Sequence, residues 1–190
     1  MKSVLDIIIA IISTPIVWIF IIYLIYLYNK LVKSRNMQKE AWSGVDVQLK
    51  KRHDLVPNLI NIVKTYAAHE SKLIEEVTLA RSSAVDAQVM SEKNGGEGLL
   101  GMQLGKLMVV VEDYPDLKAD ENFLDLQDSL SEIEDTIQHA RRYYNGCVRD
   151  LNNLIETFPS TIVARIFRFQ KADFFEIQDP KERKVPKSYK

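Results

Sequence analysis

The chain has 190 residues, 46% of them hydrophobic, and a formal net charge of -1 at pH 7. So small a charge gives no field strong enough to attract nucleic acid, and nucleic acid is therefore not an expected partner. The only cysteine is Cys147, which excludes a disulfide framework within the chain and a zinc site built from cysteines.

Residues 1–29 are predicted to form a transmembrane anchor. No charged residue occurs from Ile7 to Asn29, and a helix over these 23 positions would measure roughly 34 Å. That length is enough for a hydrocarbon core of about 30 Å. A cleaved signal peptide is the competing interpretation, but its apolar stretch would be shorter and would end at a small-residue cleavage site. The predicted membrane-spanning residues include Ile7, Pro15, Trp18 and Tyr28, and proline is tolerated at such depth.

Positive charges are more numerous after this span than before it. Lys2 precedes the span and is partly offset by Asp6, whereas basic residues follow it at positions 30, 33, 35 and 39. The positive-inside bias therefore predicts that the C-terminal domain lies in the cytoplasm.

A helical region is predicted from about Val45 to Ala87, because apolar residues recur there at alternating spacings of three and four. Arg52 and Glu70 stand at the two positions of this pattern that lack an apolar residue. Pro57 interrupts the region, so a kink or a restart of the helix is expected there.

The segment SEKNGGEG at residues 91–98 is predicted to be a loop. A shorter helix is expected from Leu99 to Val111. Gly101 and Gly105 would allow another helix to approach it closely.

The clearest helix prediction runs from about Ala119 to Glu156. Apolar and small residues alternate at spacings of three and four from Phe123 to Phe158, a heptad pattern over five repeats. The favoured interpretation is the core stripe of an antiparallel bundle, and an intermolecular coiled coil is the alternative. Cys147 falls on the stripe, so it is expected to be a small buried hydrophobic residue and not a nucleophile.

Two basic segments are candidate contact sites. The densest run contains Lys50, Lys51 and Arg52. A solvated helix face is the simplest interpretation of this run, and contact with anionic lipid or an acidic partner is the functional one.

The second basic segment, residues 160–170, is amphipathic and carries Arg165 and Arg168. It can lie on the membrane surface or pack on the bundle or on a second subunit. Packing is slightly favoured because Asp173 and Glu176 soon dilute the positive charge. The basic tail after it is expected to be disordered.

Motifs that carry chemistry are incomplete or missing in this sequence. His69 and Glu70 begin like a zinc-protease motif, but the position that needs the second histidine is Leu73. No phosphate-binding loop and no nucleophile elbow occur. The sequence therefore predicts no catalytic residue, no metal ligand and no cofactor.

Several long segments of the sequence nevertheless match, in the same order, segments of a known protein family. They are EAWSGVDVQLKKRHDLVPNLI from Glu40 to Ile60, YAAHE from Tyr66 to Glu70, VTLAR from Val77 to Arg81, YPDLKADENF from Tyr114 to Phe123, ARRYYN from Ala140 to Asn145 and FPSTIVA from Phe158 to Ala164. In this order they resemble the LemA family of bacterial membrane proteins over nearly the whole chain. The tail after about Asp179 is longer than the family pattern.

The resemblance agrees with an all-α fold, in which a single N-terminal transmembrane helix is followed by an antiparallel bundle of long helices. The expected domains are a transmembrane anchor at 1–29, a LemA-like helical bundle at 30–177 and a disordered basic tail at 178–190. The resemblance implies a single-pass protein of the bacterial inner membrane with no established catalytic activity. One family relative is linked to the formation of magnetosome membranes, and the gene often neighbours a membrane protease of the HtpX type.

The leading functional hypothesis is a non-enzymatic, self-associating, membrane-anchored scaffold that organises or remodels the bacterial cell envelope. Its partners would be membrane lipid and further copies of the chain. The alternative is an adaptor that presents substrates or lipids to another membrane protein, such as an HtpX-type protease. An enzyme or a small-molecule receptor would need a buried cluster of titratable groups, which the periodicity does not indicate.

Overall fold

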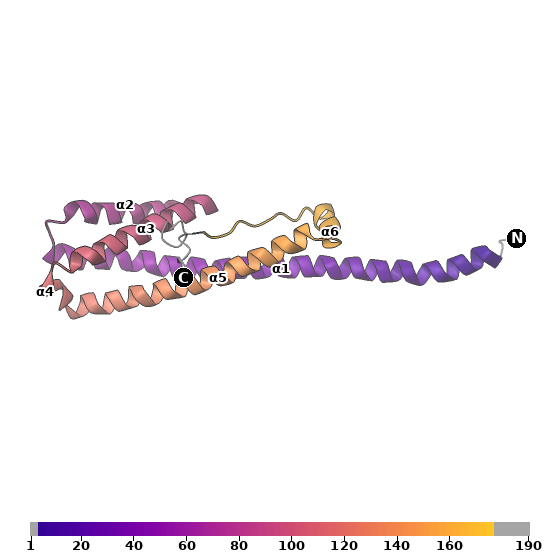
Figure 1. Cartoon of the computed structure of the whole chain (residues 1–190), viewed down its shortest axis with the longest axis horizontal. Helices are drawn as coiled ribbons and strands as arrows, with labels where there is room; N and C mark the ends of the chain where they lie inside the picture. Colours follow the sequence, from indigo (N-terminus) through magenta and orange to yellow (C-terminus); the bar gives the residue numbers. More distant parts are fainter. Residues whose placement is uncertain (1–3, 177–190) are drawn as a thin grey trace, which may run out of the picture. The chain divides into compact units, whose positions relative to one another are not determined.

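The structure is a computed structural model that describes residues 4–176, with side chains described from Pro15 onward. Every element in the described part is an α-helix, as the sequence predicts (Figure 1). The chain divides into two compact units, each built from separate segments. Unit 1 comprises Met1–Trp42 with Asn145–Ala172, and unit 2 comprises Ser43–Tyr144 with Asp173–Lys190. The predicted basic tail at 178–190 lies outside the described residues.

The first helix, α1, runs from Val4 to Tyr66 and therefore contributes to both units. The sequence predicts either a kink or a restart at Pro57, and the structure excludes the restart because one helix continues through this residue. A proline inside a helix removes one backbone hydrogen bond. Its neighbours Val56 and Leu59 are fully buried in the core of unit 2, and we attribute the continuity to this burial, which offsets the lost hydrogen bond.

Unit 2 continues with α2 (Ser71–Asp86), α3 (Met90–Val111) and the single turn α4 (Pro115–Lys118). The connections between the long helices are only a few residues long, which makes successive helices antiparallel. These helices share one apolar core with parts of α1 and the later helix α5. The core residues include Val56, Leu59, Val63, Ile74, Val77, Leu100, Leu107 and Phe123.

The start of α3 differs from the sequence prediction. Residues 91–98 were expected to form a loop, but α3 begins at Met90 and includes them. The Glu92 side chain accepts hydrogen bonds from the backbone N–H groups of Gln88 (3.0 Å) and Val89 (3.4 Å). These bonds satisfy backbone donors at the start of the helix, so the glycines that follow do not prevent the helix from forming.

Gly96 marks a close approach between α2 and α3. A Cβ atom at Gly96 would lie 2.9 Å from the Cα atom of Ala84, closer than real side chains allow. Gly101 and Gly105 could allow such an approach as well, but among the described residues a Cβ atom at either position would meet nothing within 4 Å.

The helix α5 (Glu121–Glu156) confirms the clearest helix prediction. At its start, Asp120 Oδ1 accepts a hydrogen bond from the Phe123 backbone N–H at 3.0 Å, as an N-capping residue does. Phe123 and Tyr144 of the predicted stripe are buried in unit 2, and Cys147 is buried in unit 1. Cys147 is thus placed as a small core residue. The last described helix, α6 (Ser160–Ile166), lies within the predicted amphipathic segment and belongs to unit 1.

Replacing Gly96 with alanine should destabilise unit 2 by about 1–3 kcal/mol, because the added methyl group would push the backbones of α2 and α3 apart. Urea unfolding of the full chain in mild detergent, followed by helical circular dichroism, measures the change. Gly101→Ala in the same helix is the matched control. Since space is open at Gly101, it should be neutral or stabilising by up to about 1 kcal/mol, and equal losses in both variants would contradict the assigned close approach.

Candidate functional site

A charged cluster lies in the interior of unit 2, centred on Arg52 of α1. Both Arg52 and Glu97 of α3 are only 1% exposed, and they form an ion pair. A second guanidinium nitrogen, Nη1 of Arg52, donates to Oε2 of Glu134 on α5 at 2.7 Å. His53 Nε2 lies 2.9 Å from the other oxygen of Glu97, and Arg81 Nε donates to the His53 carbonyl oxygen at 2.7 Å. One buried carboxylate thus connects neighbouring residues of α1 with α3.

Two opposing effects act on the pKa of Glu97. Burial by itself raises the pKa of this carboxyl, but the hydrogen bond with His53 and the positive charge of Arg52 together outweigh the burial. The pKa of Glu97 therefore lies below its ordinary value of 4.5. The carboxylate remains ionised at neutral pH, as an acceptor shared by two side chains must be.

The periodicity of the sequence does not indicate a buried cluster of titratable side chains, but Arg52, Glu97 and His53 form one. The charged atoms of this cluster pair with one another. The cluster therefore joins helices and leaves no charged group directed at a substrate. Among the buried polar atoms of these described side chains, Arg52 Nε alone has no hydrogen-bond partner. Removing either member of such a pair leaves an uncompensated buried charge, which is strongly destabilising.

Arg52 was expected to belong to a basic surface with Lys50 and Lys51. The structure places Lys50 and Lys51 on the exposed side of α1, but it places Arg52 in the interior. Arg52 stands at a position of the helical pattern where an apolar residue is otherwise expected, and this position indicates burial. The sequence gives no sign of its partner Glu97, because the composition of residues 91–98 predicts a loop. Arg52 is therefore not available to lipid or to a partner in this arrangement.

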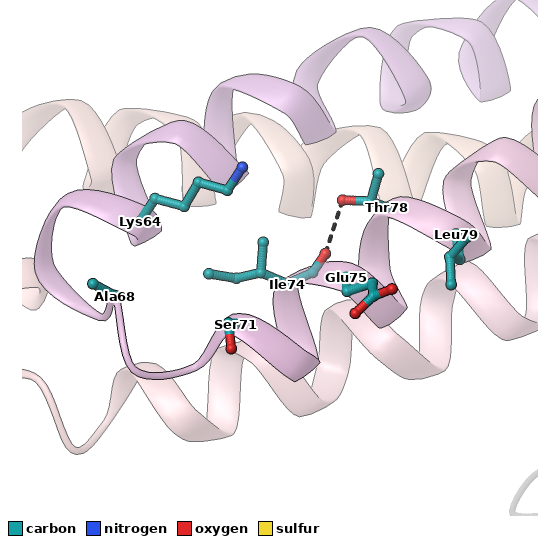
Figure 2. Close-up of a pocket in the computed structure, with 7 residues that line it drawn as sticks. All are labelled: Lys64, Ala68, Ser71, Ile74, Glu75, Thr78 and Leu79. Carbon is teal, nitrogen blue, oxygen red and sulfur yellow. Dashed lines mark hydrogen bonds between the residues drawn. The ribbon is translucent and has the colours of Figure 1, made fainter.

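A shallow, open pocket of about 480 Å³ lies in unit 2 between the end of α1 and the first turns of α2 (Figure 2). Its charged lining residues, Lys64 and Glu75, are both exposed to solvent. The Thr78 hydroxyl donates to the Ile74 carbonyl oxygen of its own helix at 2.8 Å, so it is not directed at a ligand. Among the described residues, no group of three or more His, Cys, Asp or Glu side chains could hold a metal ion.

The apolar half of α1 is described from Pro15 onward. The segment Pro15–Tyr66 contains a window long and apolar enough to cross a membrane, and only 11% of that window is buried within the structure. A core helix of a soluble protein would be mostly buried. Pro15 and Trp18 are exposed, as membrane-facing residues would be, whereas the side chain of Ile7 lies outside the described residues.

In unit 1, α6 packs on the end of this apolar stretch. Leu27 and Leu31 of α1 form a buried cluster with Val163 and Ala164 of α6. The aromatic ring of Tyr28 extends this contact to residues that follow α6. It lies 4.6 Å from the Phe167 ring and 6.1 Å from the Phe169 ring, measured between ring centroids.

Basic side chains accompany this contact. The guanidinium carbon of Arg35 lies 5.1 Å from the centroid of the Phe169 ring, in the range of a cation–π interaction. Arg165 and Arg168, both expected as contact residues, are exposed. The backbone of Arg168 has a φ of 55°, the left-handed conformation that commonly reverses the chain after a helix.

Fold and site together define a class: a membrane-anchored, all-α protein with one N-terminal helix that can cross a bilayer. The LemA family model matches residues 41–188, and the chain belongs to the LemA family. The chain is similar to the magnetosome proteins MamQ 1 and MamQ 2 of Paramagnetospirillum magneticum, each 27% identical over 87% of this chain and 71% of the relative. It is also 27% identical to the protein LemA of Metamycoplasma hominis, over 85% of this chain and 73% of that protein.

Arg52→Ala should lower the free energy of unfolding by about 3–5 kcal/mol, because it leaves the buried Glu97 carboxylate without its cationic partner. Chemical unfolding of the full chain in detergent measures this loss. The control is Lys51→Ala, whose exposed side chain should matter by less than about 0.5 kcal/mol.

A double variant, Arg52→Met with Glu97→Leu, should recover much of the loss, since it removes both buried charges. If the double variant were as unstable as Arg52→Ala, the buried ion pair would not be the source of the effect.

Proposed function

We propose that this protein is a non-enzymatic, self-associating scaffold that is anchored in the bacterial inner membrane and organises or remodels the cell envelope. The observation that carries the proposal is the unusual character of α3. A surface helix of a soluble domain normally has one apolar face and one polar face. From Gly98 to Val111, however, α3 contains only one charged residue, Lys106, and apolar side chains lie around its whole circumference.

One face of α3 packs in the core through Leu100, Leu107 and Val111. The opposite face is exposed although it is also apolar: Met102 is 52% exposed and Val109 is 71% exposed. A helix that is apolar on every side is typical of one covered on every side. We infer that the second face is covered in the functional assembly.

A second copy of the chain is the proposed cover. The exposed face of α3 also carries Gly105, where open space would allow another backbone to come close. A face with a single positive charge can meet itself across a two-fold axis with little repulsion, as isologous contacts require. The exposed apolar span of α1 supports the membrane part of the proposal.

The names of the relatives fit this proposal. Two of them are named as proteins of the magnetosome, and none of the names states a reaction. The mutual pairing of Arg52 and Glu97 also supports a structural role for the buried charges, because each group is already paired with the other.

The alternative function is an adaptor for another membrane protein, such as an HtpX-type protease. An adaptor would use the same exposed face of α3 for a different partner.

Light scattering of the full chain in mild detergent should give a protein mass at least twice that of one chain. Met102→Glu should shift the mass toward that of a monomer, because it places a charge in the proposed contact. Leu124→Glu, at a similarly exposed position of α5, is the matched control and should leave the mass unchanged. A monomeric unmodified protein would contradict self-association, and a stoichiometric foreign partner on α3 would favour the adaptor.

The proposed orientation follows from the basic residues after the span and places the helical domain in the cytoplasm. Protease added to right-side-out vesicles should therefore leave the domain intact. The same protease should cleave it once detergent has opened the vesicles. Digestion from outside before permeabilisation would reverse the orientation.

A further inference from the structure

The outer surface of α6 has an unusual composition. The residues that α6 turns toward α1 are buried, whereas several large apolar side chains on and beside α6 are exposed to solvent. Phe158, just before α6, is 75% exposed, and Ile166 at its end is 67% exposed. Ile162 and Phe167 are also exposed. All four side chains stay exposed in the described part of unit 1, and of these Phe167 also contacts the Tyr28 ring of α1.

The same segment is positively charged. From Thr157 to Ala172 the sequence contains Arg165, Arg168 and Lys171 and no acidic residue. Arg165 and Arg168 are exposed next to the apolar side chains. Exposed apolar side chains interspersed with arginines are the features of helices that lie in the headgroup region of anionic membranes.

The contact with α1 fixes the level of α6 along the proposed transmembrane helix. Within unit 1, α6 packs on Leu27 and Leu31 of α1, and Leu24 lies against the same cluster. The uncharged stretch ends at Asn29 and Lys30 follows it. Since each helical residue rises about 1.5 Å, α6 lies within one or two turns of the point where the hydrocarbon core gives way to headgroups. Figure 1 shows α6 beside this part of α1.

We infer that α6, together with Phe158 and Phe167, forms a second membrane contact that inserts into the interface of an anionic bilayer beside α1. The four exposed apolar side chains enter the acyl boundary, and Arg165 and Arg168 bind lipid phosphates. The occupant is lipid and not a protein because α6 sits on the last apolar turns of the span itself. This inference rests on the proposed anchoring of α1 in the membrane.

The test measures the depth of single fluorescent labels in vesicles. The full chain, with Cys147→Ala as background, carries an environment-sensitive fluorophore on one introduced cysteine: Ile166→Cys on α6, Ile22→Cys in the span or Leu79→Cys on α2. All three positions are exposed in the structure. The vesicles contain phosphatidylcholine, with or without phosphatidylglycerol, and a doxyl-labelled lipid quencher. Circular dichroism confirms that each labelled protein keeps its helical content.

The label at residue 166 should be quenched about threefold or more above the label at residue 79, and the label at residue 22 should be quenched as well. Phosphatidylglycerol should strengthen quenching at residue 166. Arg165→Gln combined with Arg168→Gln should remove that dependence on phosphatidylglycerol, whereas Lys50→Gln with Lys51→Gln, the control, should not.

Other outcomes separate this inference from the proposed function. Quenching at residue 22 but not at residue 166 would overturn the α6 contact and leave the anchor intact. A label at residue 166 that is shielded from aqueous iodide but not quenched by doxyl lipid would show that protein covers α6, and would also overturn the inference. Loss of quenching at both positions would overturn the proposed anchor itself.

Discussion

A guanidinium group that water cannot reach must find its counter-charge inside the protein, and in unit 2 this requirement falls on Arg52. Its pairing with Glu97 joins α1 to α3, and its second bond reaches Glu134 on α5. A buried ion pair contributes less net stability than apolar residues of similar volume. Its effect is on specificity, because a shift of α3 along α1 would leave two charges unpaired. We regard the cluster as the device that fixes the register of the surrounding apolar core.

In unit 1 the governing constraint is the boundary between lipid and water. The apolar residues of α1 that face outward are suited to lipid, and the first basic residues follow directly after them. The α6 segment also combines apolar and basic side chains, here interspersed within a few residues. Both elements therefore carry the composition of one interface, although they come from opposite ends of the sequence. The LemA family assignment is compatible with this arrangement and does not by itself explain it.

Periodicity was sufficient to predict α5, which buries a regular stripe over many turns, and the part of α1 that follows Val45. The start of α1 was predicted from its uncharged apolar run instead. Periodicity failed at the start of α3, where Glu92 satisfies the helix terminus and the glycine-rich stretch becomes helical. That error also concealed Glu97, the partner of Arg52. The contact between Leu27 and Val163 was likewise beyond prediction. Pairing between distant segments depends on which faces meet, and one sequence does not record this.

The segments of unit 1 have a consequence for biosynthesis. Leu27 and Leu31 are made roughly 130 residues before the residues that cover them, Val163 and Ala164. Translation at about 5–20 residues per second leaves this apolar surface uncovered for several seconds or longer. This exposed apolar surface favours insertion of the nascent chain into the bilayer before the fold is complete. On this view, membrane insertion comes before the closure of unit 1.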